Sequence, residues 1–382
     1  MKDFHVMRFC CLFTALLAAV NVSRAQDVAS LQAELDALLS TNRAPLAVWD
    51  VTGRLEAGFG YRDNLLMTTV APESSPFISS AGDFSAIRIS ETGSEWVNFL
   101  LAEDLRYLDA KSVDGETLIS ATSRFSKPIN PRNTLGAELF YLYQNQVLDV
   151  SETELDLRRV LVEGHGVSLR PDWKHDFSED WFLRLEASAQ RQFYQGELDD
   201  LWEVGAKAGI ARKLGRASEA SLSFRTEHWI YDTREQTDQS GVPVAGTHLY
   251  YWRPEVLGEW RQRWGQEGRW RTHTKLAWLW NADNGSGYFD YDRLTLGQRI
   301  RWVHPKWEVS AGVRCGWYFY SVQQTESDYR ERFYLIVEGR VERRLAKHWL
   351  VFADAQREWN RSNEPLDEYR DWQCRGGLVV EF

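Results

Sequence analysis

The chain has 382 residues and a formal net charge of -10, which argues against a nucleic-acid partner. Its mean hydropathy of -0.46 is that of a soluble protein, and no segment approaches the ~20 consecutive apolar residues that a membrane helix needs. These two observations exclude a helical membrane protein. They do not exclude a membrane β-barrel, because half of each barrel strand is polar.

The N-terminus has the features of a secretory signal peptide. Lys2 and Arg8 precede a short apolar run at residues 9–20, and residues 23–25 form a small-x-small cleavage pattern. We predict that residues 1–25 are a signal peptide, which directs the mature chain out of the cytoplasm.

Residues 26–50 differ in pattern from the rest of the chain. Val28, Leu31, Leu35 and Leu38 recur at helical spacing, and Pro45 ends the pattern. We predict a short helical periplasmic segment. A lone amphipathic helix or tether is favoured, with a trimeric coiled coil as the alternative.

From residue 51 to residue 382 the chain alternates between apolar and polar side chains in about sixteen segments, each of strand length. The clearest is the last, residues 371–382, which places Trp372, Leu378 and the terminal Phe382 on one face and Asp371 and Glu381 on the other. In lipid, every backbone amide must be paired internally, so a sheet spans a membrane only when it closes. The predicted fold is all-β: a closed transmembrane antiparallel β-barrel.

The lengths of the connections test this prediction independently. Such barrels join their strands by short turns at one end and longer loops at the other. Residues 64–82, 147–158 and 233–247 read as long loops, whereas residues 91–94, 214–218, 304–306 and 345–348 read as tight turns. The alternation is weakest in the strands near residues 84–90 and 160–170, and the turn near residues 171–179 is longer than the rule prefers. A β-propeller is the soluble alternative, but no repeated blade motif is found.

Aromatic residues and cysteines also fit a barrel. Eighteen Trp, fifteen Tyr and eighteen Phe are an excess suited to the two interfacial girdles of a membrane barrel. The mature chain keeps Cys315 and Cys374, which fall on the lipid-facing side of two non-adjacent strands. We therefore expect no disulfide.

The opposite, polar faces should line the lumen, and in strands ten to fourteen they are rich in basic residues. Five acidic residues accompany them: Glu255, Glu259, Glu308, Glu338 and Glu342. The basic lumen candidates are Arg253, Arg261, Arg263, Arg271, Lys275, Arg293, Arg299, Arg301, Arg314, Arg332, Arg340 and Arg344.

The last two strands add Asp354, Glu358, Asp371 and Glu381, so a field across the lumen is predicted, of the kind that selects ions. This pattern favours a channel for small anionic or saccharide solutes. Tyr251, Tyr318, Tyr320 and Tyr334 are candidates to stack on sugar rings. Salt-bridged ladders that fill the interior are the alternative.

The sequence contains no GxSxG, HExxH or CxxC motif and no phosphate-binding glycine loop, so we predict no enzyme activity and no metal or other cofactor. His165, His228, His248 and His273 lie on separate strands, and spacing alone leaves a Ser–His pair near the rim open. Several outer loops are acidic. Divalent cations bridging to lipopolysaccharide are one use for them, and solvated loops are the favoured interpretation.

The signal peptide, the Tyr61-Arg62-Asp63-Asn64 pattern that ends the first strand, and the C-terminal Phe382 together resemble the outer-membrane β-barrel porin-like families of Gram-negative bacteria. The resemblance implies a location in the outer membrane, with both termini periplasmic and with lipid and lipopolysaccharide as surroundings. It also implies that Phe382 is a C-terminal assembly signal, which the barrel insertion machinery recognises. Related barrels serve nutrient uptake or exopolysaccharide export, so an export or surface-assembly barrel is the second functional reading.

Overall fold

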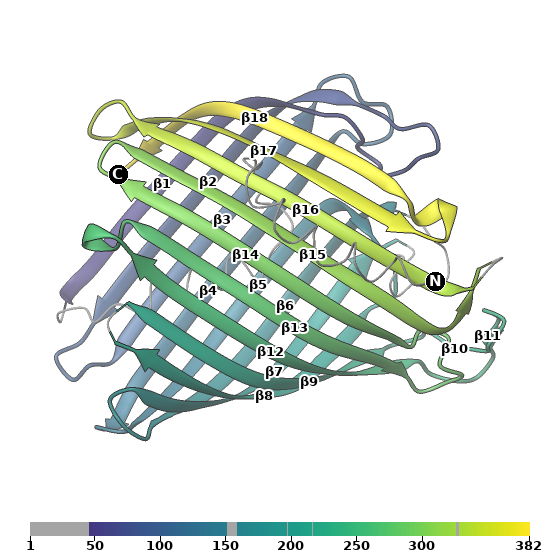
Figure 1. Ribbon diagram of the computed structural model, residues 1–382, viewed down its shortest axis with the longest axis horizontal. Coiled ribbons are helices and arrows are strands. Elements are labelled where there is room, and N and C mark those ends of the chain that lie inside the picture. Colours follow the sequence, from purple (N-terminus) through teal and green to yellow (C-terminus); the bar gives the residue numbers. More distant parts are fainter. Residues whose placement is uncertain (1–45, 151–158, 197, 216, 326–327) are drawn as a thin grey trace, which may run out of the picture.

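The computed structural model describes residues 46–150, 159–196, 198–215, 217–325 and 328–382. Within them sixteen antiparallel strands form one closed barrel, and two very short strands, β10 and β11, pair in a loop (Figure 1). The strands are β1 (Leu46–Arg62), β2 (Ser75–Ile89), β3 (Glu95–Tyr107), β4 (Gly115–Asn130), β5 (Asn133–Asp149), β6 (Arg159–Asp176), β7 (Trp181–Gln195), β8 (Leu201–Leu214), β9 (Ser218–Tyr231), β10 (Gln236–Thr237), β11 (Pro243–Val244), β12 (Tyr250–Trp264), β13 (Trp270–Asp283), β14 (Tyr291–His304), β15 (Trp307–Gln324), β16 (Tyr329–Arg344), β17 (Trp349–Ser362) and β18 (Tyr369–Glu381).

The barrel closes where its first strand meets its last. β1 pairs with β18 from Arg54 opposite Glu381 to Arg62 opposite Gln373. At the edge of this seam the backbone N–H of Phe382 donates to the carbonyl of Gly53 at 3.0 Å, and the N–H of Gly53 donates back at 2.9 Å. Within the described residues the barrel has no free strand edge, so the predicted closed transmembrane barrel of about sixteen strands is confirmed.

The two ends of the barrel differ in the length of their connections. At one end, the turn end, the connections have two to five residues; at the other, the loop end, they have four to eighteen. The longest, residues 232–249, contains the β10–β11 pair and projects beyond the barrel at the right of Figure 1. The predicted alternation of short and long connections is therefore present.

Two strands are longer than the sequence pattern indicated. β2 begins at Ser75, inside the predicted long loop, and pairs with β1 along its whole length. β6 continues through Pro171 to Asp176, where a long turn was expected. Proline lacks an N–H, and the β6–β7 ladder skips from Leu169 to Asp172, so Pro171 sits where no bond to β7 is made.

The predicted signal peptide and most of the predicted helical segment lie outside the described residues. The barrel itself starts five residues earlier than predicted, because Leu46 already pairs with Ile89 and Asp50 with Ile87 on β2. Residues 46–50 therefore belong to β1 and not to a helix. Two single-turn 3-10 helices are described, Gln266–Gly268 and Pro365–Asp367, and no helix in the described ranges is long and apolar enough to cross a membrane.

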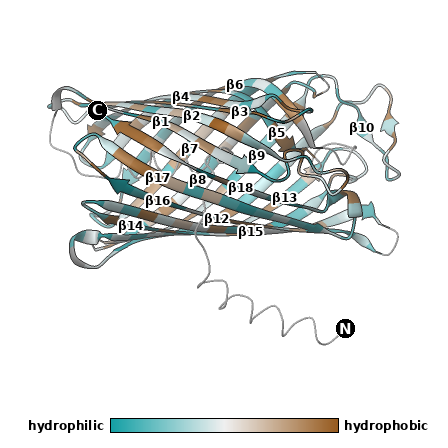
Figure 2. Cartoon of the chain, turned by 90° about the horizontal axis from the view of Figure 1, so that it is seen from above, coloured by the Kyte–Doolittle hydropathy of each residue, from teal (hydrophilic) through white to brown (hydrophobic). Residues whose placement is uncertain are grey.

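Brown and teal residues alternate along the strands in Figure 2, and large apolar side chains are exposed on the outward face of the barrel. Leu55, Leu139, Leu222 and Leu276 are more than half exposed. Exposed tryptophans gather near both ends: Trp96, Trp181, Trp264, Trp270, Trp307 and Trp349 toward the turn end, and Trp202, Trp252, Trp278 and Trp280 toward the loop end. This is the pair of aromatic girdles expected of a barrel that spans a bilayer. Cys315 and Cys374 are free thiols.

The inner face departs from the prediction on one side of the barrel. The alternation predicted polar inner faces throughout, but β3, β4 and β5 turn Leu101, Leu118, Phe140 and Leu142 inward, where they form a buried cluster. The barrel is broader in Figure 1 than in the perpendicular view of Figure 2, so its cross-section is flattened. Part of the interior is thus a packed apolar core, although the same strands also turn buried charged residues inward, such as Glu116 and Glu138.

Candidate functional site: the barrel lumen

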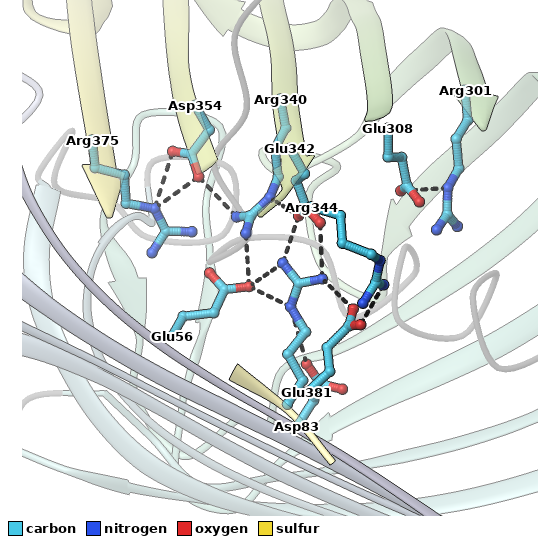
Figure 3. Close-up of polar contacts among 11 residues, drawn as sticks. Glu56, Asp83, Arg301, Glu308, Arg340, Glu342, Arg344, Asp354, Arg375 and Glu381 are labelled. Atoms are coloured by element: carbon cyan, nitrogen blue, oxygen red, sulfur yellow. Dashed lines mark hydrogen bonds and ion pairs between the residues drawn. The ribbon is translucent and has the colours of Figure 1, made fainter. Parts of the chain in front are cut away.

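A buried ion-pair network occupies the lumen beside the seam of the barrel. Arg340 on β16 donates to Glu56 on β1 at 2.7 Å, to Glu342 at 2.5 Å and to Asp354 on β17 at 2.9 Å (Figure 3). Arg375 on β18 also donates to Asp354, at 3.0 Å. The side chains of Arg340 and Asp354 are only 6% and 1% exposed.

The network extends toward the turn end through two further arginines. Arg54 on β1 donates to Glu56 at 2.9 Å and to Glu342 at 2.5 Å. Arg344 donates to Glu381 at 2.5 Å, and this pair is about one-third exposed. The register explains the meeting, because β1, β18, β17 and β16 are consecutive in the barrel and each places an alternate charged residue inward. These charges satisfy one another within the wall.

A second set of contacts crosses the lumen near the loop end. Arg332 on β16 donates to Asp149 on β5 and, at 2.8 Å, to Asn360 on β17. In the strand order β5 and β16 lie seven strands apart in one direction and nine in the other, so they are almost opposite. Arg62 on β1 contacts Glu116 on β4, three strands away, at 3.0 Å and Asp371 on the adjacent β18 at 2.9 Å. Opposite walls of the barrel are therefore tied together on this side.

The β1–β2 loop, residues 63–74, fills the space beside these ion pairs. Leu65 and Met67 are almost fully buried in a cluster with Val147 on β5 and Tyr369 on β18. The side chain of Asn64 holds the loop: its amide donates to the carbonyls of Thr68 and Arg370, at 2.9 and 2.8 Å. The mouth is thus packed on the side of β1–β5 and β16–β18.

The remaining inner wall carries charges that are far more open. The side chains of Arg225, Arg299 and Arg301 are 36–41% exposed, whereas those of Arg62, Arg332 and Arg340 are 5–6% exposed. Arg299 pairs with Glu338 at 3.0 Å, and Arg301 with Glu308 at 2.6 Å. In Figure 3 the Arg301–Glu308 pair stands apart from the buried network.

Three arginines lie side by side on this open wall near the turn end. Arg263 on β12 is directly opposite Arg271 on β13, which is directly opposite Arg301 on β14. Like charges at opposed positions destabilise a sheet. Among the described residues Arg301 has Glu308 as a partner, but neither Arg263 nor Arg271 makes an ion pair. We call these three residues the arginine row.

Other predicted lumen residues have local partners. Glu259 accepts a hydrogen bond from His273 at 3.0 Å and lies within 4 Å of Arg261 and Lys275. Toward the loop end, Arg253 stacks on Trp229 with 3.7 Å from the guanidinium carbon to the ring centre, Arg293 donates to the Tyr318 hydroxyl at 3.2 Å, and Arg314 faces inward opposite Gly297 and Ile336.

The four carboxylates predicted to oppose the basic wall do not form an open acidic surface. Asp354, Asp371 and Glu381 are held by Arg340, Arg62 and Arg344, and Glu358 accepts from the Tyr369 hydroxyl at 2.5 Å. Sequence alternation placed these side chains inward but could not pair them. Glu116 and the Leu65–Met67 segment were missed, because a β4 residue and a loop reach their partners only once the barrel is closed.

No catalytic or metal-binding arrangement is found in the described ranges. His165 contacts the Tyr141 hydroxyl at 2.9 Å, and no described histidine is hydrogen-bonded to a serine. No group of three or more metal-ligating side chains comes together there either. Asp283, the last residue of β13, accepts from the backbone N–H groups of Gly285, Gly287 and Phe289 at 2.7–2.9 Å. It organises its own loop.

No protein-family model and no curated protein sequence matches the chain. Among solved structures it is similar to OccAB3 and OccAB1 of Acinetobacter baumannii, both at 10% identity over 87% of this chain, with TM-scores of 0.47 and 0.45 and coverage of 100% and 97% of those chains. It is also similar to OpdK of Pseudomonas aeruginosa, in a structure with vanillate, at 11% identity and a TM-score of 0.42, over 89% of this chain and 100% of that one. Sequence identities and TM-scores this low do not support a transfer of function. The function is therefore inferred from the residues that line this barrel.

Proposed function

We propose that this protein is an outer-membrane channel and that small anionic solutes pass along the inner face of β9 and β12–β15. The observation that carries the proposal is the division of the inner wall into two parts. Beside the seam, arginines and carboxylates are buried in mutual ion pairs; along β12–β14, the arginine row is exposed, and two of its members have no carboxylate partner in the described structure.

The physical basis of the selectivity is the closeness of three like charges. Charges are screened over about 8–10 Å at physiological salt, and directly opposed residues of a sheet are only about 5 Å apart, so a solute that passes the row is attracted by more than one guanidinium group. A row of three guanidinium groups would raise the local concentration of anions despite the net charge of -10 of the whole chain.

A saccharide solute has less support than an anionic one. Stacking on a sugar ring needs an open aromatic face, but Tyr251, Tyr318 and Tyr320 are at most 4% exposed. Tyr318 and Tyr320 pack on Tyr291, with 5.4 Å between ring centres. Of the four tyrosines proposed for this role, Tyr334 alone is partly open. We therefore favour small anions, with acidic saccharides as a subset.

The orientation that we propose puts the loop end outside the cell and the turn end, with Phe382, in the periplasm. This follows the rule that outer-membrane barrels have short periplasmic turns and longer outer loops. In the closed barrel Phe382 is 63% exposed and its ring lies against Gly53 at the seam, so its aromatic side chain is accessible from outside. That is compatible with a role in recognition by the insertion machinery.

A barrel for export or surface assembly is the second candidate, favoured by the cross-lumen contacts at the loop end. A channel that needs a partner to open would have its mouth held shut by such contacts. Swelling of liposomes that contain only the purified protein separates the two. Swelling in small organic anions, faster than in neutral solutes of equal size, supports the channel; impermeable liposomes favour the partner-dependent barrel. A lipid hydrolase assay on the same liposomes is expected to give no product.

A further inference from the structure

Two tryptophans and two arginines form a checkerboard on the outward face of β17 and β18. Trp359 on β17 is directly opposite Arg370 on β18, and two residues toward the turn end Arg357 is directly opposite Trp372. Because side chains alternate along a strand, all four point away from the lumen, where Glu358 and Asp371 lie. Both arginine side chains are exposed, and the Arg357 guanidinium lies over the Trp359 ring, 5.0 Å from its centre.

The checkerboard lies in the aromatic girdle near the loop end. β17 ends at Ser362 and β18 begins at Tyr369, so both arginines are within five residues of the loop. Tyr61 of β1 extends the aromatic surface, with 6.2 Å between its ring centre and that of Trp372. Tryptophan and tyrosine at such positions sit at the level of the lipid headgroups. A guanidinium there meets headgroups and not hydrocarbon, where it would be unfavourable.

Among the described residues the arginines of this surface lack a carboxylate partner; Asp63, beside Trp372 on the same face, accepts instead from the Trp372 backbone N–H at 2.6 Å. Within the described part of the chain neither Arg357 nor Arg370 makes an ion pair. Arg361, also outward and exposed, adds a third positive charge. Continuation of the β17–β18 register would place Glu368 opposite Arg361, but the two side chains do not form an ion pair. By contrast, two other outward arginines near the loop end are neutralised, Arg106 by Asp104 at 2.9 Å and Arg191 by Asp232 at 2.5 Å. The β17–β18 surface thus differs from these two positions of the rim.

We propose that the checkerboard is a binding site for the phosphate group of an anionic lipid in the leaflet at the loop end. Guanidinium groups bind phosphate oxygens through paired N–H donors, and the tryptophans hold the site at the depth where those phosphates lie. In the orientation proposed above the lipid is the phosphorylated glycolipid of the outer leaflet. The site is independent of whether solutes cross the lumen.

The test is the binding of diphosphorylated lipid A to the purified barrel in detergent, measured by native mass spectrometry alongside the same lipid with its phosphates removed. The R357Q/R370Q variant should bind the phosphorylated lipid on the order of 20-fold more weakly. R357K/R370K keeps both charges but loses the paired N–H donors, so it should bind more tightly than R357Q/R370Q and more weakly than the wild type. The matched control is R212Q/R343Q, which also removes two exposed outward arginines that lie over tryptophan rings, Trp181 and Trp307. These two arginines are near the turn end, on strands that are not neighbours in the barrel. The control variant should change binding less than threefold.

Heat-modifiable migration on gels verifies that each variant is folded. Equal binding of phosphorylated and dephosphorylated lipid by the wild-type protein would overturn the proposal, and that comparison needs no variant. Equal losses in R357Q/R370Q and R212Q/R343Q would overturn it as well. Full competition by inorganic phosphate at millimolar concentration would identify a free-anion site and contradict a lipid site.

Discussion

Arg332 on β16 and Asp149 at the end of β5 form an ion pair that joins opposite walls of the barrel. Both side chains are largely buried, at 5% and 12% exposure, and Asn360 supports the arginine from β17. Since the two strands are separated by at least seven positions around the barrel, only the closed fold can bring them together. The pair limits the opening of the lumen at the loop end.

We expect Arg332→Gln to widen the mouth, because its removal unties β16 from β5. The measurement is single-channel conductance in a planar bilayer, where R332Q should show a larger conductance or longer openings than the wild type. Arg344→Gln is the control: it removes one positive charge from the same strand, but its pair with Glu381 lies at the turn end and is partly exposed. Identical behaviour of the two variants would mean that the cross-lumen pair does not restrict the path.

The buried network should depend strongly on Asp354. This carboxylate accepts from both Arg340 and Arg375, so Asp354→Asn leaves two buried guanidinium groups without their shared partner. Removing one partner from a buried ion pair lowers the free energy of unfolding by roughly 3–5 kcal/mol. Glu308→Gln breaks the partly exposed pair with Arg301 and should cost less than about 1 kcal/mol. Urea unfolding followed by tryptophan fluorescence gives both values, and similar losses would show that the network is not the stabilising element.

The assignment of the two faces predicts opposite tolerance at neighbouring positions of β13. Leu276 is 52% exposed and lies in one outward row with Leu296 and Cys315. Leu276→Arg puts a charge into hydrocarbon, at roughly 2–4 kcal/mol near the midplane. The adjacent Lys275 faces the lumen, and Lys275→Gln should have little effect on stability. Unfolding free energies in lipid vesicles decide this, and equal sensitivity would invert or abolish the face assignment.

The sequence predicted the architecture because most strands have one uniformly apolar face. On β15, for example, the outward Val309, Val313 and Trp317 alternate with an inner row of charged, tyrosine, serine and glycine residues, and a register error would put every charge into lipid. The same rule fails on β3, where Leu101 and Leu105 point inward and the exposed Arg106 outward near the rim. Alternation separates two faces but identifies the inner one only where that face is polar.

The candidate site was only partly predictable for a related reason. The pattern placed Arg332, Arg340 and Arg271 on the inner wall alike, but their surroundings differ: the first two are buried in ion pairs and the third is exposed in the arginine row. Those surroundings depend on strands far away in sequence, on closure at the seam and on the inward course of residues 63–74. The alternation of residues within a single strand predicts none of these three features.

The loop between β13 and β14 should respond to pH through Asp290. Burial raises the pKa of the Asp290 carboxyl above its ordinary value, and the charge of Asp283 acts in the same direction, while a hydrogen bond from the Asp283 backbone N–H at 2.7 Å opposes them. Because the pKa is higher in the folded state than in the unfolded state, protonation of Asp290 stabilises the folded loop. This stabilisation is fully present below the unfolded-state pKa and is lost as the pH rises through the folded-state pKa.

Asp290→Asn keeps the hydrogen-bond acceptor and removes the charge. We therefore expect the loop of D290N to resist proteolysis better than that of the wild type at pH 7, and the advantage to disappear at pH 3. The ratio of cleavage rates of the two proteins at each pH is the measurement, since it cancels the pH dependence of the protease. A ratio that stays constant would contradict the shift.

The reversal potential of the purified protein in a planar bilayer under a potassium chloride gradient tests the central claim most directly. We predict chloride preference for the wild type and a shift of the reversal potential toward zero or toward cation preference in R263S/R271S, while Arg212→Ser on the outward face leaves it unchanged. Cation preference or no conductance in the wild type, or an unchanged potential in R263S/R271S, would contradict an anion path along the arginine row.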